Sequence, residues 1–191
     1  MADGIRAALF SKITLLPIII LVFATIYGSV SAGGIEAEQT AELAGYFHNF
    51  FGEVPKGGSG LLLSSAKKYL LVWFLIFLSG PILPGFIINI GTVWERGFAI
   101  GYTSACFYGV YGAKGIFACL TLLPEMLVFV PILVFFSSIS LKMSFFAHEN
   151  KKLFLKKYFL FSIFFLTAFC VVSLFQTFLT TTFMRVISRV L

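Results

Sequence analysis

The chain has 191 residues, of which 59% are hydrophobic and 12% charged, with a formal net charge of +6. Soluble domains usually carry about 25% charged residues, so this composition leaves too little polar surface for a water-facing globule. It excludes a soluble enzyme, a disordered tail and a nucleic-acid-binding domain. The composition predicts one small integral membrane protein, in which loop lysines that set the topology account for the positive charge.

The apolar segments predict an all-α, polytopic membrane helix bundle of about five transmembrane helices. Strands of a β-barrel alternate in polarity, whereas the run from Pro17 to Phe23 does not, so the spans are expected to be helices. We treat the chain as one membrane domain with four parts. These are an N-terminal anchor helix, an extracytoplasmic amphipathic loop, a core, and a lysine-rich loop with the last span: residues 1–30, 31–66, 67–146 and 147–191.

The first apolar run, from Ile13 to Val30, follows Arg6 and Lys12 and has two interpretations. A charged start, an apolar stretch and the small residues at 29–32 are features of a cleaved signal peptide. The apolar run is long for a signal peptide, which favours an uncleaved anchor helix. Gly28, at its outer end, offers a small surface for helix packing.

The only long polar stretch, residues 31–60, is expected to contain an amphipathic helix. Leu43, Phe47, Phe50 and Val54 recur at spacings that place them on one helix face. This face either lies in the membrane interface, with its aromatic rings among the headgroups, or docks a partner protein. Both interpretations remain open at the level of the sequence.

A first helix break is predicted in the apolar run 69–89, where two glycines and two prolines fall close together: Gly80, Pro81, Pro84 and Gly85. These residues are not tolerated in an undisturbed helix, so we expect a kinked or discontinuous span. Such a break either bends a helix around its neighbour or coordinates an ion or substrate. Glu95 and Arg96 are expected to close this block at the membrane surface.

A second break is predicted in the apolar stretch 115–146, which as one helix would be about 48 Å long and too long for one untilted span. Pro124 and Glu125 suit the first turn of a new helix, so a half-helix should end near Leu123 and a full span should follow. Pro131 adds a second kink. Glu125 is either a polar group deep in the bilayer or a first-turn carboxylate near its surface.

Small residues follow Arg96 at every fourth position: Gly97, Gly101, Ala105, Gly109 and Ala113. This spacing clears one helix face, so that the backbone of another helix can approach closely. We therefore expect this segment to be the buried centre of the bundle.

The strongest cluster of positive charge comes before the last apolar run: Lys151, Lys152, Lys156 and Lys157. The positive-inside rule places this cluster in the cytoplasm. The N-terminus, with Arg6 and Lys12, is expected on the same side. The acidic loop 31–60 and the C-terminus would then be extracytoplasmic.

The sequence shows no recognisable catalytic or metal-binding pattern. His48 and His148 are far apart, and three isolated cysteines lie inside apolar segments, as buried free thiols do: Cys106, Cys119 and Cys170. No phosphate-binding glycine loop or serine elbow is present. We expect no enzyme, no cofactor and no metal.

An ordered set of motifs covers residues 69–146. The span with the glycines and prolines is followed by Arg96–Tyr102, Tyr111–Gly115, Leu122–Glu125, Pro131 and the serines Ser138, Ser140 and Ser144. In this order and spacing the segment resembles the stage II sporulation protein M family. The aromatic segment Leu43–Phe47 and the overall length fit as well.

The resemblance implies a non-enzymatic scaffold in the cell membrane. Family members from endospore formers are polytopic proteins of the septal and engulfing membranes. They anchor a peptidoglycan-degrading complex with the stage II sporulation proteins D and P. The implied partners are these or similar wall hydrolases, besides the lipid bilayer, and a homo-oligomer is compatible with the sequence. The competing interpretation, motivated by the two helix breaks, is a transporter or permease subunit that moves a small solute.

Overall fold

The computed structural model describes residues 12–34, 37–52, 59–82, 84–123, 125–146 and 151–187. Regular structure in these residues is helical throughout, which confirms the predicted all-α bundle. The longer helices are α2 (Lys12–Ala32), α3 (Ala37–Gly52), α4 (Ser59–Ser79), α5 (Gly85–Tyr111), α7 (Val130–Phe146) and α8 (Lys151–Ile187). Short helical segments join α5 to α7: η1 (Gly112–Lys114), α6 (Gly115–Cys119), η2 (Leu120–Leu122) and the π-type turn η3 (Glu125–Phe129).

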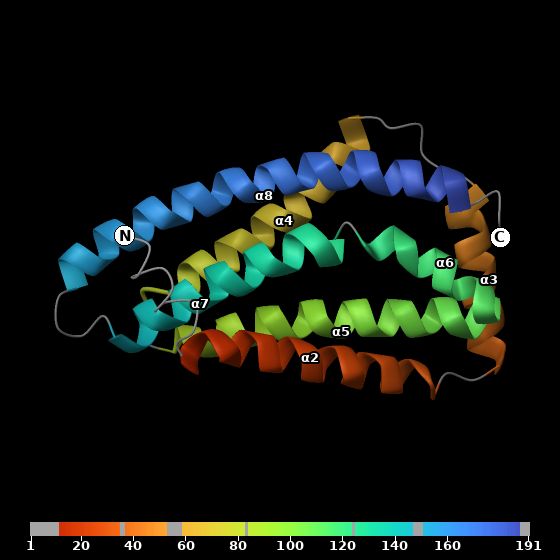
Figure 1. The fold of residues 1–191 in the computed structure, drawn as a ribbon, viewed down its shortest axis with the longest axis horizontal. Helices are drawn as coiled ribbons and strands as arrows, with labels where there is room; N and C mark the ends of the chain where they lie inside the picture. The colour runs from red at the N-terminus through yellow and green to blue at the C-terminus, as the bar shows by residue number, and fades with distance from the viewer. Residues whose placement is uncertain are drawn as a thin grey trace.

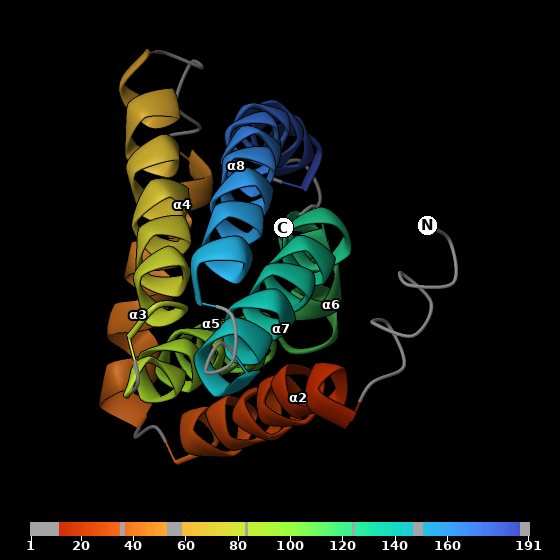
Figure 2. The ribbon, with the colours of Figure 1, turned by 90° about the vertical axis from the view of Figure 1, so that its left-hand side faces the viewer.

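The helices run along one long axis, except α3, which lies across one end of the bundle (Figure 1). α2 and α8 begin at the same end, and α8 ends at the other, near α3 (Figure 1). Figure 2, which looks along this axis, shows α2 on one side and α4 and α8 on the other. The α2–α5 contact is the most extensive in the described residues, and α5 also contacts α3, α4, α6 and α7.

The described residues contain 4 helical stretches that are long and apolar enough to cross a membrane: Ile13–Ala32, Gly85–Leu122, Met126–Phe145 and Leu155–Phe175. This pattern is that of a multi-pass membrane protein. The expected span over 69–89 is divided between α4, which ends at Ser79, and α5, which begins at Gly85. The break is therefore a turn between two helices, and not a bend within one. α4 also carries Lys67 and Lys68 near its middle, which shortens its apolar part.

The chain reverses direction after α5. Gly112 has a φ of 58°, in the left-handed region that favours glycine. A Cβ on Gly115 would overlap the backbone of Phe107, so α6 packs directly against the last turns of α5. α6 and α7 then run back along α5 (Figure 1). The predicted half-helix near Leu123 thus corresponds to α6 and η2, whereas Pro124 and the side chain of Glu125 lie outside the described residues.

Two apolar clusters hold the described helices together. The larger one joins α4, α7 and α8 through aromatic rings, among them Tyr69, Phe129 and Phe169. The smaller one joins α3 and α6 to the end of α5 and includes Phe47 and Phe107. Many large apolar side chains also point outward, as is typical of helices that face lipid chains.

Candidate functional site

The predicted stripe of small residues meets α2 over its first half. A Cβ at Gly97 would lie 2.7 Å from the carbonyl oxygen of Leu21, and one at Gly101 would overlap the carbonyl of Thr25. Gly28 of α2 faces the backbone of α5 in the same way. Because no side chain separates these positions, the two helix backbones are in direct contact, as small residues permit.

The second half of the stripe does not pack on α2. Ala105 and Gly109 instead line a hollow of about 340 Å³ between α2, α3 and α5, and a Cβ on Gly109 would meet nothing within 4 Å. Ala113 lies beyond α5, in the exposed η1 turn. The expected close approach of another helix backbone is therefore found at Gly97 and Gly101, and not at Ala105, Gly109 or Ala113. The physical reason is that α2 ends at Ala32 and the chain turns at Gly112.

The predicted docking face of α3 is turned inward. Phe47 is only 7% exposed, and its ring centroid lies 4.8 Å from that of Phe107 on α5. Leu43 packs against the same cluster. Since Phe47 is buried against the end of α5, it is not available to a partner, which corrects the docking interpretation for this residue, whereas Leu43 is half-buried. The side chain of Phe50 and all of Val54 lie outside the described residues.

The glycines of the first break are required by close contacts in the turn between α4 and α5. A Cβ on Gly80 would lie 2.5 Å from the ring carbon Cζ of Tyr158, and one on Gly85 would overlap the backbone of Ser79. Pro81 and Pro84 are exposed in this turn. The turn is consequently held tightly against α8.

A buried polar cluster lies beside this turn, and our sequence reasoning missed it. Asn89 of α5 is 1% exposed, and its Nδ2 donates hydrogen bonds to Ser79 Oγ at 3.3 Å and to the Ser137 carbonyl at 3.2 Å. In return, Ser137 Oγ donates to Asn89 Oδ1. The hydroxyls of Ser79 and Ser140 are 2.7 Å apart. α4, α5 and α7 are thus joined by hydrogen bonds inside the bundle.

The same region satisfies the last carbonyls of α4. The Ile76 carbonyl accepts a hydrogen bond from Ser140 Oγ at 2.9 Å. The single hydroxyl proton of Tyr158 is shared between the Ile76 carbonyl, 3.1 Å from Oη, and the Phe77 carbonyl, 2.9 Å from Oη. The last four carbonyls of a helix have no partner within it, and an unsatisfied one costs several kcal/mol away from water. Donors from α7 and α8 therefore allow α4 to end inside the bundle.

The sequence did hold one signal for this cluster, the serines concentrated in α7 and the asparagine in α5. Small polar side chains in membrane helices typically hydrogen-bond across to a neighbouring helix. For Ser140 the acceptor is the Ile76 carbonyl of α4, 64 residues earlier in the chain. Nothing in the residue types identifies that carbonyl.

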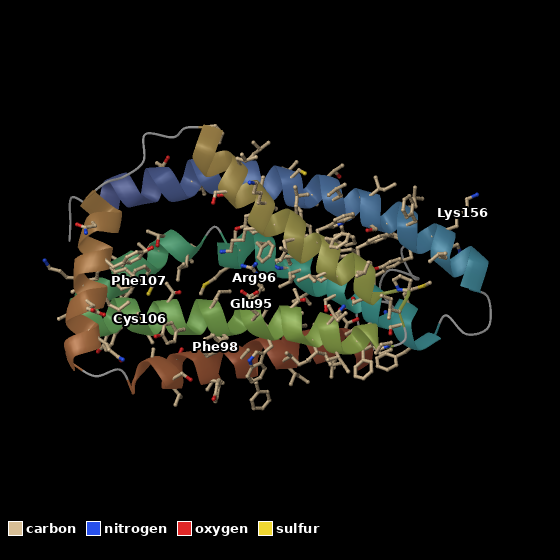
Figure 3. The ribbon with its side chains drawn as sticks, turned by 180° about the vertical axis from the view of Figure 1, so that it is seen from behind. Glu95, Arg96, Phe98, Cys106, Phe107 and Lys156 are labelled. Atoms are coloured by element: carbon tan, nitrogen blue, oxygen red, sulfur yellow. The ribbon has the colours of Figure 1, made fainter. Side chains whose placement is uncertain are left out.

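Glu95 and Arg96 form an ion pair within α5 and not at its end. Arg96 Nε lies 3.2 Å from Glu95 Oε2, and the two side chains are 7% and 62% exposed. Figure 3 shows both extending from α5 on the side away from α2. The guanidinium carbon of Arg96 is 5.9 Å from the ring centroid of Phe129, a cation–π geometry. The expected end of the block at these charges was wrong, because α5 continues unbroken to Tyr111.

Glu95 belongs to an exposed face of α5, which we name the Glu95 face and define by Ile87, Gly91, Glu95 and Ala99. These residues recur every fourth position, so they lie on one side of the helix, and all four are exposed. A Cβ on Gly91 would meet nothing within 4 Å. Acidic side chains within spans rarely face lipid, since an Asp at the helix centre costs about 2.5–3.5 kcal/mol on insertion scales.

Other chemistry in the described part of the chain is sparse. No group of three or more His, Cys, Asp or Glu side chains there is arranged to hold a metal ion. Cys106, Cys119 and Cys170 are free thiols. The side chain of His48 and all of His148 lie outside the described residues. Comparisons with known protein families, curated proteins and solved structures found no match.

Proposed function

We propose that this protein is a non-enzymatic membrane scaffold that anchors a peptidoglycan-degrading complex at the septal and engulfing membrane during endospore formation. The role follows from the resemblance to the stage II sporulation protein M family, whose D and P partners carry the hydrolytic chemistry. The structural observation that carries the proposal is the Glu95 face. It is an uncovered helix face with a carboxylate in a membrane-spanning segment.

A partner helix is the occupant that this face fits. Gly91 and Ala99, one turn to either side of Glu95, leave room for another backbone to approach. The partner would contribute a hydrogen-bond donor to the Glu95 carboxylate, which removes the cost of exposing that group to lipid. A symmetric contact with a second copy would instead bring two Glu95 carboxylates together, which is unfavourable.

The proposed topology places the N-terminus and the lysine cluster of 151–157 in the cytoplasm and the C-terminus outside. This arrangement is supported by the common end at which α2 and α8 begin (Figure 1). α3 would then lie on the outer side. Wall-remodelling partners would reach the scaffold from that side.

Affinity purification from native membranes, with hydrolases quantified by mass spectrometry, tests the scaffold. We expect wall hydrolases to co-purify with the wild type and their recovery to fall about three- to tenfold with Glu95→Leu, the effect of losing one interhelical hydrogen bond to a carboxylate. Glu42→Leu, at an exposed acid of α3, is the matched control and should leave recovery unchanged. If the wild type recovers no hydrolase, the scaffold proposal fails. If both variants behave alike, the Glu95 face is not the docking surface.

A second candidate function is a transporter or permease subunit for a small anionic solute. The observation that favours it is Arg96, a buried cation packed on Phe129 where the helix breaks between α6 and α7. This candidate predicts that a transported anion raises the thermal unfolding midpoint of the purified protein, and that Arg96→Gln removes this shift. A panel of small anions that gives neither a shift nor uptake into proteoliposomes would eliminate it.

A further inference from the structure

A hollow of about 400 Å³ lies between α4 and α8, which stand side by side in Figure 2. Its walls are almost entirely apolar and include Leu63, Ala66 and Leu70 of α4 and Phe169, Cys170 and Leu174 of α8. Ligand sites commonly have volumes of about 300–1,000 Å³. We call this hollow the α4–α8 groove.

The groove lies at the edge of the hydrocarbon layer. On α8, the apolar span runs from Leu155 to Phe175, so Phe169 and Leu174 fall in its last two turns. On α4, the apolar run begins at Tyr69, directly after Lys67 and Lys68. Residues near the end of the apolar span of α8 and near the start of the apolar run of α4 line the same groove. Each helix therefore indicates that the groove lies where acyl chains meet headgroups.

The charge around the groove is positive. Lys67 is exposed on α4. It lies between Ala66 and Leu70, which both line the groove. Neither α4 nor α8 contains an Asp or Glu, so these two helices contribute only positive charge beside the groove. A lysine at a membrane interface attracts anionic headgroups.

We propose that the α4–α8 groove binds an anionic phospholipid, with an acyl chain between the helices and its phosphate held by Lys67. A phospholipid supplies both required parts, an apolar chain for the walls and a negative charge at the level of Lys67. The inference does not depend on the scaffold function, since it rests on the shape, lining and charge of this groove alone.

Cys170 provides a built-in reporter, because it is exposed in the groove wall. The chain has 3 cysteines, so Cys106→Ala with Cys119→Ala leaves Cys170 as the only thiol. The rate of its alkylation by N-ethylmaleimide, an uncharged reagent, would be measured in detergent. Phosphatidylglycerol and phosphatidylcholine with identical acyl chains would each be added at increasing concentration.

We expect phosphatidylglycerol to protect Cys170 at a concentration about 3- to 10-fold lower than phosphatidylcholine does, as one interfacial lysine provides. Lys67→Ala should abolish this preference. The matched control is Lys156→Ala, near the opposite end of α8, which should retain it.

Ala66→Trp, which fills the groove, gives a second test that keeps Lys67. Native mass spectrometry should then show loss of the retained anionic lipid, while thermal unfolding in detergent verifies that the variant is folded. Equal protection by the two lipids, or protection by neither, would overturn the proposal. Protection that requires a co-purified protein would identify the groove as a protein-docking site and overturn it as well.

Discussion

Gly101→Leu is expected to destabilise the protein by at least about 3 kcal/mol, because the new side chain cannot be placed without moving a helix. A Cβ at this position would already overlap the backbone carbonyl of Thr25, and backbone yields less easily than a flexible side chain. The hydrogen bond from Ser29 Oγ to the Gly101 carbonyl, 3.2 Å long, would be lost as the helices separate. The measurement is the thermal unfolding midpoint in detergent, together with the monodisperse fraction on size exclusion.

Gly91→Leu is the matched control, since Gly91 lies in the same helix and a Cβ there meets nothing within 4 Å. It makes the same residue change with the same gain in helix propensity, so any general effect of the substitution is shared. Phe98→Leu, a conservative change in α5, should also have a much smaller effect than Gly101→Leu. Similar losses in all three variants would argue against a close α2–α5 contact.

Asn89→Ala should have the second largest effect, a loss of about 2–3 kcal/mol. Asn89 joins Ser79 on α4 to Ser137 on α7, and both polar atoms of its side chain, Nδ2 and Oδ1, form hydrogen bonds. The substitution removes these bonds, leaves buried hydroxyls to find other partners, and opens a cavity. The free energy of unfolding, measured by denaturant titration in mixed micelles, gives the magnitude.

Thr92→Ala controls for the loss of a buried hydroxyl in the same helix. Thr92 is also buried, but its Oγ1 donates only to the Ile88 carbonyl in its own helix, at 2.8 Å. Its removal therefore breaks no bond between helices and should cost well under half as much. If Thr92→Ala were as damaging as Asn89→Ala, the cross-helix cluster would not be the source of the stability.

The fold class could be predicted from the sequence because hydropathy depends only on local composition. The position of the first helix break could also be predicted, since glycine and proline change the conformation of the backbone at their own positions. Whether the break bends one helix or separates two helices could not be predicted. That outcome depends on donors that cap α4 from elsewhere in the chain, Ser140 and Tyr158.

Periodicity likewise identified which residues share a face of α3, but not what covers that face. The partner of Phe47 is Phe107, about 60 residues away, and no local pattern specifies such a contact. The interfacial and docking interpretations both assumed that the apolar face looked away from the protein. Neither considered the end of the bundle itself as the covering surface.

The charges Glu95 and Arg96 were misplaced for a related reason. The cost of charge in hydrocarbon favours a position at the membrane surface, and sequence reasoning applied that rule directly. The structure lowers the cost in another way, by pairing the two side chains and setting Arg96 against Phe129. This arrangement leaves the Glu95 carboxylate exposed.

The length of α8 has a mechanical consequence. At 1.5 Å per residue its 37 residues extend about 55 Å, whereas the hydrocarbon layer is about 30 Å thick. No proline or glycine interrupts the helix, so it has no built-in hinge. A displacement of the end of α8 that carries the lysines would therefore tilt the whole helix and move its opposite end. Such a rigid helix couples the positions of residues on the two faces of a membrane mechanically.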